Sequence, residues 1–255
     1  MEIGFRSPLL DFFRRGDVAH DVRLLAAQGA LTPRAHEQLA LLVMLSSDPD
    51  PEIATAANAT LGIIPRGSLS AFLARTEVSP DMREFFAKRG VEPGDVPAQD
   101  EDKPIVDTAT GPDIADDEDD EKSAMQRLAA LTVPQKMARA TKGTREERGI
   151  LIRDPNKLIA VAVLSSPKLT DSEVEAIAKM SSVSEEILRI ISTNRNWMKS
   201  YVVVSALARN PKTPVAVSMN LLQRLTEKDL RMLSTNRNVA EVVRTTARRK
   251  IVVDK

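Results

Sequence analysis

Apolar residues recur along most of the chain at the three- and four-residue spacing of an α-helix. Val174, Ile177 and Ala178 fall on one helical face, and Leu230 and Leu233 share another. Prolines, glycines and short Asn- or Asp-containing segments separate these stretches. The pattern therefore predicts an all-α protein made of many short helices.

Residues 1–92 are predicted to form an N-terminal helical lobe of five helices. Each helix is preceded by a residue that caps helix N-termini or by a proline suited to a first turn. The predicted starts are Asp17, Thr32, segment 48–52, Ser68 and Ser79. Five helices are enough for a small core of their own.

Residues 93–123 differ sharply from the flanking sequence. They carry 2 basic and 12 acidic side chains, four prolines and the unbroken acidic run 116–121. Few of them are apolar enough to offset the entropy of ordering the chain. We predict a flexible, disordered acidic linker here.

Residues 124–255 contain an internal repeat. Ser-Thr-Asn-Arg-Asn occurs at 192–196 and again at 234–238, an offset of 42 residues. Over 184–209 and 226–251, eight of 26 aligned positions are identical. A fixed offset near 40 residues is typical of stacked helical hairpins. We therefore expect an α-solenoid in this lobe, with the hairpin turns aligned along one edge.

Capping boxes are expected to start several helices of this lobe. Thr144 with Glu147, Thr170 with Glu173, and Ser182 with Glu185 have the required spacing. The β-branched segment 201–204 favours a strand on propensity alone. Because apolar residues flank it on both sides, we predict instead one helix of 12 or 13 residues that begins at Trp197.

Two short segments resemble known helical repeats. Ala-Arg-Asn-Pro-Lys-Thr-Pro at 208–214 resembles a turn of the bacterial leucine-rich repeat variant family. Ser-Asp-Pro-Asp-Pro-Glu-Ile at 47–53 resembles a helix start found in that family and in HEAT repeats. The resemblance implies a curved, all-helical solenoid that binds partners. It departs from the variant family in its longer repeat, and the family's cysteine cluster is absent, so no iron–sulfur site is carried over.

Composition narrows the possible functions. The chain of 255 residues has no cysteine, which excludes disulfides and thiolate chemistry, and aromatic residues make up only 3%. No stretch reaches the 18 apolar residues of a membrane span, and the N-terminus lacks a signal-peptide pattern. We expect a cytoplasmic protein that does not enter the membrane.

Catalytic, nucleotide and metal signatures are also missing from the sequence. Neither a phosphate-binding loop nor a Gly-x-Ser-x-Gly elbow occurs. His20 and His36 stand 16 residues apart, with only Asp17 and Asp21 near the first, and run 116–121 lacks the ligand spacing of a calcium loop. We therefore predict neither an enzyme nor a metal or cofactor site, and no small-molecule substrate.

Charge points to a macromolecular partner. Residues 124–255 carry 24 basic and 12 acidic side chains, a net charge of +12. We expect a non-catalytic scaffold whose basic solenoid binds a protein. The alternative is a nucleic-acid-binding protein that residues 93–123 mask by imitating a polyanion. A helical-repeat DNA glycosylase is a third hypothesis, but Trp197 has no acidic residue three or four positions away.

Five residues are the candidates for partner contact: Arg195, Trp197, Lys199, Tyr201 and Arg237. Stacked turns would bring the two arginines to one edge, and Trp197 and Tyr201 would share a helix face. Two structural alternatives stay open. Capping of the next helix is enough to account for the Asn residues of the repeated motif. The aromatic pair is equally suited to packing between repeats.

Overall fold

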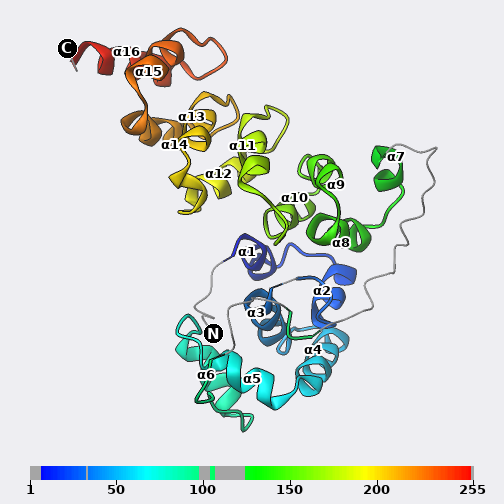
Figure 1. Cartoon of the computed structure of the whole chain (residues 1–255). Coiled ribbons are helices and arrows are strands. Elements are labelled where there is room, and N and C mark those ends of the chain that lie inside the picture. Colours follow the sequence, from blue (N-terminus) through cyan, green and yellow to red (C-terminus); the bar gives the residue numbers. More distant parts are fainter. Residues whose placement is uncertain (1–6, 33, 98–103, 107–123, 254–255) are drawn as a thin grey trace. The chain divides into compact units, whose positions relative to one another are not determined.

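A computed structural model describes residues 7–32, 34–97, 104–106 and 124–253 (Figure 1). Within them the chain is entirely helical, which confirms the all-α prediction, and it contains no strand. The α-helices are Pro8–Arg15 (α1), His20–Ala27 (α2), Ala35–Leu45 (α3), Pro51–Ile63 (α4), Arg66–Leu73 (α5), Pro80–Ala87 (α6), Ala124–Ala129 (α7), Val133–Lys142 (α8), Arg145–Leu151 (α9), Lys157–Leu164 (α10), Asp171–Lys179 (α11), Glu185–Thr193 (α12), Tyr201–Arg209 (α13), Val215–Leu221 (α14), Glu227–Thr235 (α15) and Glu241–Val253 (α16).

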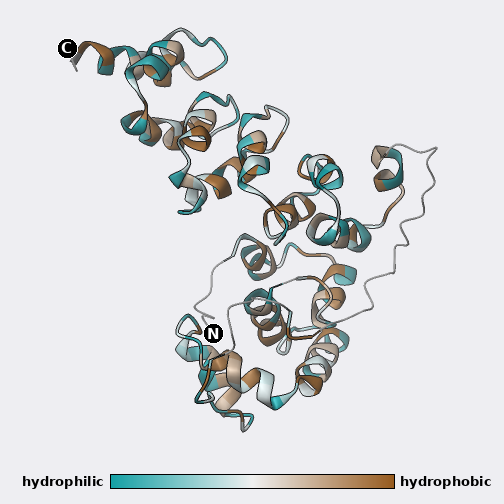
Figure 2. Cartoon of the chain, in the orientation of Figure 1, coloured by the Kyte–Doolittle hydropathy of each residue, from teal (hydrophilic) through white to brown (hydrophobic). Residues whose placement is uncertain are grey.

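Two short 3-10 helices, Trp197–Lys199 (η1) and Leu222–Arg224 (η2), precede α13 and α15. Brown and teal residues alternate around most helices in Figure 2, as expected for short amphipathic helices with one buried face. None of the helices in the described residues has the length and apolarity needed to cross a bilayer.

Two compact units make up the chain, and they interleave in sequence. Unit 1 comprises Met1–Glu147 and Ala162–Lys168, and unit 2 comprises Arg148–Val161 and Leu169–Lys255. The lobe boundaries predicted from the distribution of charge, 1–92 and 124–255, remain a prediction. Each unit is described below by itself.

Unit 1 begins one helix earlier than the sequence pattern predicts. Helix α1 starts after Ser7, whose hydroxyl oxygen accepts a hydrogen bond from the Leu10 amide at 3.3 Å. Helix α2 begins at His20 rather than at Asp17, and α3 begins at Ala35 rather than at Thr32. These two predicted starts are wrong because the chain enters both helices through extended residues that use no side-chain cap.

Helix α3 is the centre of unit 1. Ten of its 11 residues are buried, and it packs against α1, α2, α4 and α6. Leu39, Ala40 and Leu42 are fully enclosed at 0% exposure. A helix that is apolar on nearly every side must lie inside a core, so the run 39–45 is the interior of this unit.

Gln38 of α3 holds a distant piece of chain. Its side-chain oxygen accepts hydrogen bonds from the Ile105 amide at 2.9 Å and the Val106 amide at 3.0 Å. Its side-chain nitrogen donates to the carbonyls of Gly29 at 2.7 Å and Val106 at 3.0 Å. The predicted linker is thus ordered at 105–106, and at its start the Gly94 amide donates to the Ser70 carbonyl at 2.9 Å, so disorder is wrong for these two parts. Residues 98–103 and 107–123 of the predicted linker lie outside the described residues.

Unit 2 is built from helices that pack on close neighbours in the chain. Helix α11 contacts α12 and α13, helix α13 contacts α14, and α16 contacts α14 and α15. The 42-residue offset maps Glu185–Thr193 of α12 onto Glu227–Thr235 of α15. Because α15 is the third α-helix after α12, the sequence repeat spans three α-helices and not one two-helix hairpin.

Hydrogen bonds connect the turns of unit 2 in two separate rows. In one row, the Asn210 side-chain nitrogen donates to the carbonyls of Ala178 and Met180, so the turn after α13 meets the turn after α11. In the other row, Arg224 donates to the carbonyl of Met198, so the segment after α14 meets the segment after α12. Successive turns therefore alternate between two edges of the unit.

A buried ion pair ties α9 to α11 within unit 2. Two guanidinium nitrogens of Arg148 lie 3.0 and 2.8 Å from Oε1 of Glu173. The other carboxylate oxygen accepts from the amide and hydroxyl of Thr170, each at 2.9 Å, which completes the predicted capping box. The predicted box at Thr144 and Glu147 is also confirmed. The predicted box at Ser182 is wrong, because Ser184 is the residue that precedes α12.

Candidate functional site

The repeated Ser-Thr-Asn-Arg-Asn motif forms a turn that follows a helix. Asn194 directly follows α12, and its side-chain oxygen accepts from the amides of Asn196 at 3.0 Å and Trp197 at 3.3 Å. Asn236 directly follows α15 and accepts from the Asn238 amide at 3.0 Å. The asparagines therefore shape the turn, as the structural alternative predicts.

The structure does not bring the two motif arginines together. Arg195 lies in the turn between α12 and α13, and Arg237 lies in the turn between α15 and α16. Turns alternate between edges, and these two are three steps apart, so they belong to opposite edges of unit 2. Figure 1 shows the two turns on different sides of this unit. The expected single ridge of arginines is wrong. Both side chains are exposed.

Trp197 and Tyr201 do not share a helix. Trp197 begins η1, and Tyr201 begins α13. Ser200 between them has extended backbone angles, φ −72° and ψ 119°, which end one helix before the next starts. The prediction of one helix from Trp197 is therefore wrong, although its C-terminal part, Tyr201–Arg209, is helical as expected. Trp197 is half-buried and Tyr201 is 41% exposed.

The Tyr201 hydroxyl joins the first residue of α13 to the first turn of α15. It accepts a hydrogen bond from the Thr226 amide at 3.0 Å and donates to the Asp229 carboxylate. The Thr226 hydroxyl oxygen in turn accepts from the Asp229 amide at 3.3 Å. Tyr201 thus holds two neighbouring helix starts together, which is a positioning role.

The length of the Asp229 side chain explains why a tyrosine is needed there. At Thr170 the Glu173 carboxylate reaches back to the capping residue's own amide. Asp229 takes the equivalent place at Thr226 but is one methylene shorter. The phenol oxygen of Tyr201 fills the remaining gap and satisfies an amide that would otherwise be left to solvent.

Three cations gather on the edge that carries Trp197. We call the segments 194–200 and 222–226 the tryptophan edge. Arg195, Lys199 and Arg224 are all exposed there. Lys199 donates to the Asn196 side chain at 3.2 Å, and Arg224 reaches the Met198 carbonyl at 2.6 Å. The edge therefore presents positive charge beside one large, half-buried aromatic ring, with Arg224 as the member that sequence reasoning missed.

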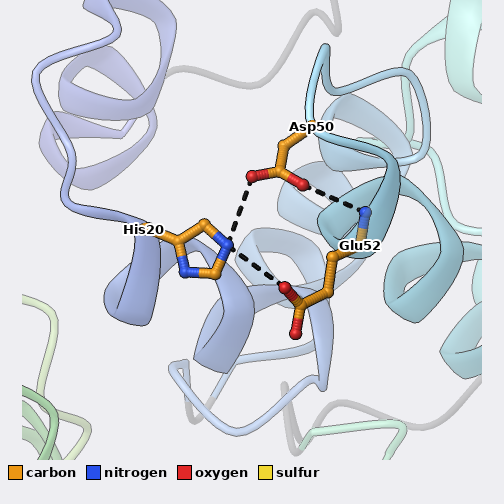
Figure 3. Close-up of side chains that lie close together, drawn as sticks. All are labelled: His20, Asp50 and Glu52. Atoms are coloured by element: carbon orange, nitrogen blue, oxygen red, sulfur yellow. Dashed lines mark hydrogen bonds and ion pairs between the residues drawn. The ribbon is translucent and has the colours of Figure 1, made fainter.

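A second group of side chains lies in unit 1 and was also missed (Figure 3). Nε2 of His20 lies 3.2 Å from a carboxylate oxygen of Asp50 and 3.5 Å from one of Glu52. In the sequence, the only acidic residues close to His20 are Asp17 and Asp21. Asp50 and Glu52 come from a helix start 30 residues later, and no pattern in the sequence indicates that α2 and α4 pack together.

Comparison with known proteins identifies no relative of this chain. No family model matches it, and neither a curated protein nor a solved structure does so.

Proposed function

We propose that the chain is a non-catalytic scaffold that binds another protein through unit 2, in the manner of a HEAT-like solenoid. The partner presents an acidic surface or segment to the tryptophan edge. Arg195, Lys199 and Arg224 attract it, and the ring of Trp197 supplies apolar contact area. Tyr201 supports this edge by fixing α13 against α15.

The observation that carries the proposal is the linkage of alternate turns in unit 2. Residues 25 and 30 positions apart connect one turn to the next but one, as Tyr201 does with Thr226 and Asn210 with Met180. Stacking of this kind aligns exposed turn residues over several helices, and an extended ligand can contact all of them at once. The sequence resemblance to helical-repeat families supports the same function.

Arg237 has a different place in this proposal. Its exposed guanidinium belongs to the edge opposite Trp197, so one compact partner contacts either Arg237 or Arg195 but not both. We assign primary contact to the tryptophan edge because three cations gather there beside an aromatic side chain. Arg237 serves as the test residue for the other edge.

A nucleic-acid partner is the second candidate function, favoured by the net charge of +12 on residues 124–255. Fluorescence anisotropy of labelled DNA and RNA with the full chain, at two salt concentrations, tests it. Phosphate contacts weaken steeply as salt rises. If residues 93–123 mask the basic face, deletion of 107–121 tightens this binding markedly.

Site-specific photo-crosslinking in cells tests the protein-scaffold proposal. A photoreactive amino acid replaces Lys199 on the tryptophan edge or, as the matched control, Lys212 on the opposite edge. Both lysines are exposed: Lys199 is the last residue of η1, and Lys212 lies in the turn between α13 and α14. We expect a discrete, protease-sensitive adduct from position 199 and a much weaker one from 212. A nuclease-sensitive adduct at 199 would establish the nucleic-acid function instead, and equal labelling at both positions would contradict a specific edge.

A further inference from the structure

The cluster of His20, Asp50 and Glu52 in unit 1 has the arrangement of a metal site. His20 is the first residue of α2, Asp50 immediately precedes α4, and Glu52 lies in the first turn of α4. One potential ligand atom from each residue lies within 4.8 Å of the other two. Figure 3 shows the imidazole directed between the two carboxylates. The three groups therefore converge on one point from two helices.

The distances match tetrahedral coordination. Zinc binds imidazole nitrogen and carboxylate oxygen at about 2.0–2.1 Å, so two ligands at tetrahedral corners lie about 3.3 Å apart. The two separations from Nε2 are 3.2 and 3.5 Å, and the two carboxylate oxygens lie within 4.8 Å of each other. A single N–H group on Nε2 can make only one good hydrogen bond, whereas a cation between the three atoms satisfies the nitrogen and both carboxylates.

Neighbouring hydrogen bonds hold Asp50 in place without using the carboxylate oxygen that faces His20. The other oxygen of Asp50 accepts from the Glu52 amide at 3.0 Å. The Asp50 amide donates to Asp48, and Arg23 of α2 fixes Asp48 through contacts of 2.7 and 2.9 Å. Support of this kind around the ligands is what orients them in metal sites.

The ligand set selects the class of cation. One imidazole and two carboxylates suit zinc and similar transition-metal ions, which accept nitrogen and oxygen together. Magnesium and calcium prefer oxygen ligands alone, so the imidazole nitrogen in this set disfavours them. With three protein ligands, one tetrahedral position remains for water.

We propose that His20, Asp50 and Glu52 form a surface site for zinc or a similar divalent transition-metal ion, which links α2 to α4. The site is independent of partner binding by unit 2. His36 is the only other histidine in the chain, and it is 5% exposed inside the core beside Phe72. His20 is therefore the imidazole that a metal in solution can reach.

Isothermal titration of the full chain with zinc chloride tests the proposal, together with the absorption spectrum of the cobalt(II) complex. Substitutions H20N and E52Q each remove one ligand from an exposed position. D21N is the matched control, because it removes a carboxylate next to His20 that is not part of the cluster. We expect one zinc site in the wild-type chain and in D21N, and at least a tenfold loss of affinity in H20N and in E52Q.

The acidic run 116–121 is the main competing source of zinc binding, and the same variants separate it from the site. Zinc held by that run alone binds H20N as tightly as the wild type, and this result would overturn the proposal. Equal affinity for magnesium would do the same, because it would indicate attraction to carboxylates without the imidazole. The visible band of tetrahedral cobalt must likewise disappear in H20N.

Discussion

The two units bury their helices in different ways. In unit 1, α3 has ten buried residues out of 11 and contacts four other helices. In unit 2, α12 and α15 each bury four residues of nine and pack mainly on helices adjacent or nearly adjacent in the chain. The first unit has a common centre, whereas the second is a series of local contacts.

This difference predicts how far the loss of structure extends from a destabilising substitution. Loss of a buried group on α3 affects every helix that touches it, so unit 1 is expected to unfold as a whole. Loss of a contact in unit 2 affects the helices on either side and leaves the more distant ones folded, because stability there is a sum of neighbour terms. Five substitutions test the contrast.

The largest effect is expected from E173Q in unit 2. Arg148 and Glu173 have side chains that are only 6% and 7% exposed, and the substitution leaves a buried guanidinium without its carboxylate. Removing one partner of such a pair costs about 3–5 kcal/mol. Hydrogen exchange measured by mass spectrometry should show lost protection in α9–α11 and retained protection in α15–α16. Exchange that rises equally throughout unit 2 would contradict serial packing.

Lowering the pH should reproduce part of this destabilisation in the wild-type chain, because it protonates Glu173. Burial by itself raises the pKa of Glu173, but hydrogen bonds from Thr170 and the charge of Arg148 outweigh it and hold the pKa below the ordinary value of 4.5. The carboxylate therefore stabilises the fold above its unfolded pKa, and that contribution is lost as the pH falls through the lower folded pKa.

Urea unfolding followed between about pH 6 and pH 3 measures this loss. E173Q should show a flatter dependence of the unfolding free energy on pH than the wild type. E186Q is the control, because Glu186 forms an exposed i,i+3 pair with Arg189 at the surface. Such pairs contribute at most about 1 kcal/mol, so E186Q should follow the wild-type profile closely.

A matched pair of leucine substitutions tests the contrast most directly. Leu42 of α3 and Leu233 of α15 are both 0% exposed, so L42A and L233A remove the same atoms from equally buried sites. Each is expected to cost about 2–5 kcal/mol locally. L42A should expose amides throughout unit 1, whereas L233A should expose only α14–α16, whose small core includes Leu222 and Val243.

Local sequence predicted the features that depend on local interactions. The capping boxes at Thr144 and Thr170 need only residues three positions apart, and both form. The helical assignment of segment 201–204 also succeeds, because its apolar neighbours outweigh β-propensity. At Ser182 the rule failed because serines at 181, 182 and 184 all offer a cap, and sequence alone does not choose among them.

Features that depend on three-dimensional arrangement could not be predicted. The motif recurs after 42 residues, but the number of α-helices within that offset decides whether Arg195 and Arg237 meet. Ser200 breaks the helix that the sequence predicts from Trp197. Nothing near Gln38 in the sequence indicates that it binds residues 67 and 68 positions away. His20 likewise acquires its carboxylate neighbours only when α2 packs on α4.

Gln38 belongs to α3, but its side chain binds the short segment at 105–106 and Gly29, so its substitution is expected to have a local effect. Q38L keeps the volume of a buried side chain and removes all four hydrogen bonds. Buried amides and carbonyls left without partners cost about 1–3 kcal/mol. The amides of Ile105 and Val106 should exchange rapidly, while the rest of α3 stays protected. Loss of protection across unit 1 would mean that this segment is part of the common core.

The smallest effect is expected from Y201F, which removes one oxygen and leaves the ring in place. The Thr226 amide and the Asp229 carboxylate each lose a hydrogen bond, at a cost of about 0.5–1.5 kcal/mol. Amides in the first turn of α15 should exchange faster, whereas α11 and α12 should be unchanged. The double variant Y201F/T226A should lose less than the sum of the single losses, because both residues stabilise the same helix start. Strictly additive losses would show that the phenol and the cap act independently, and the tyrosine would then have no part in joining α13 to α15.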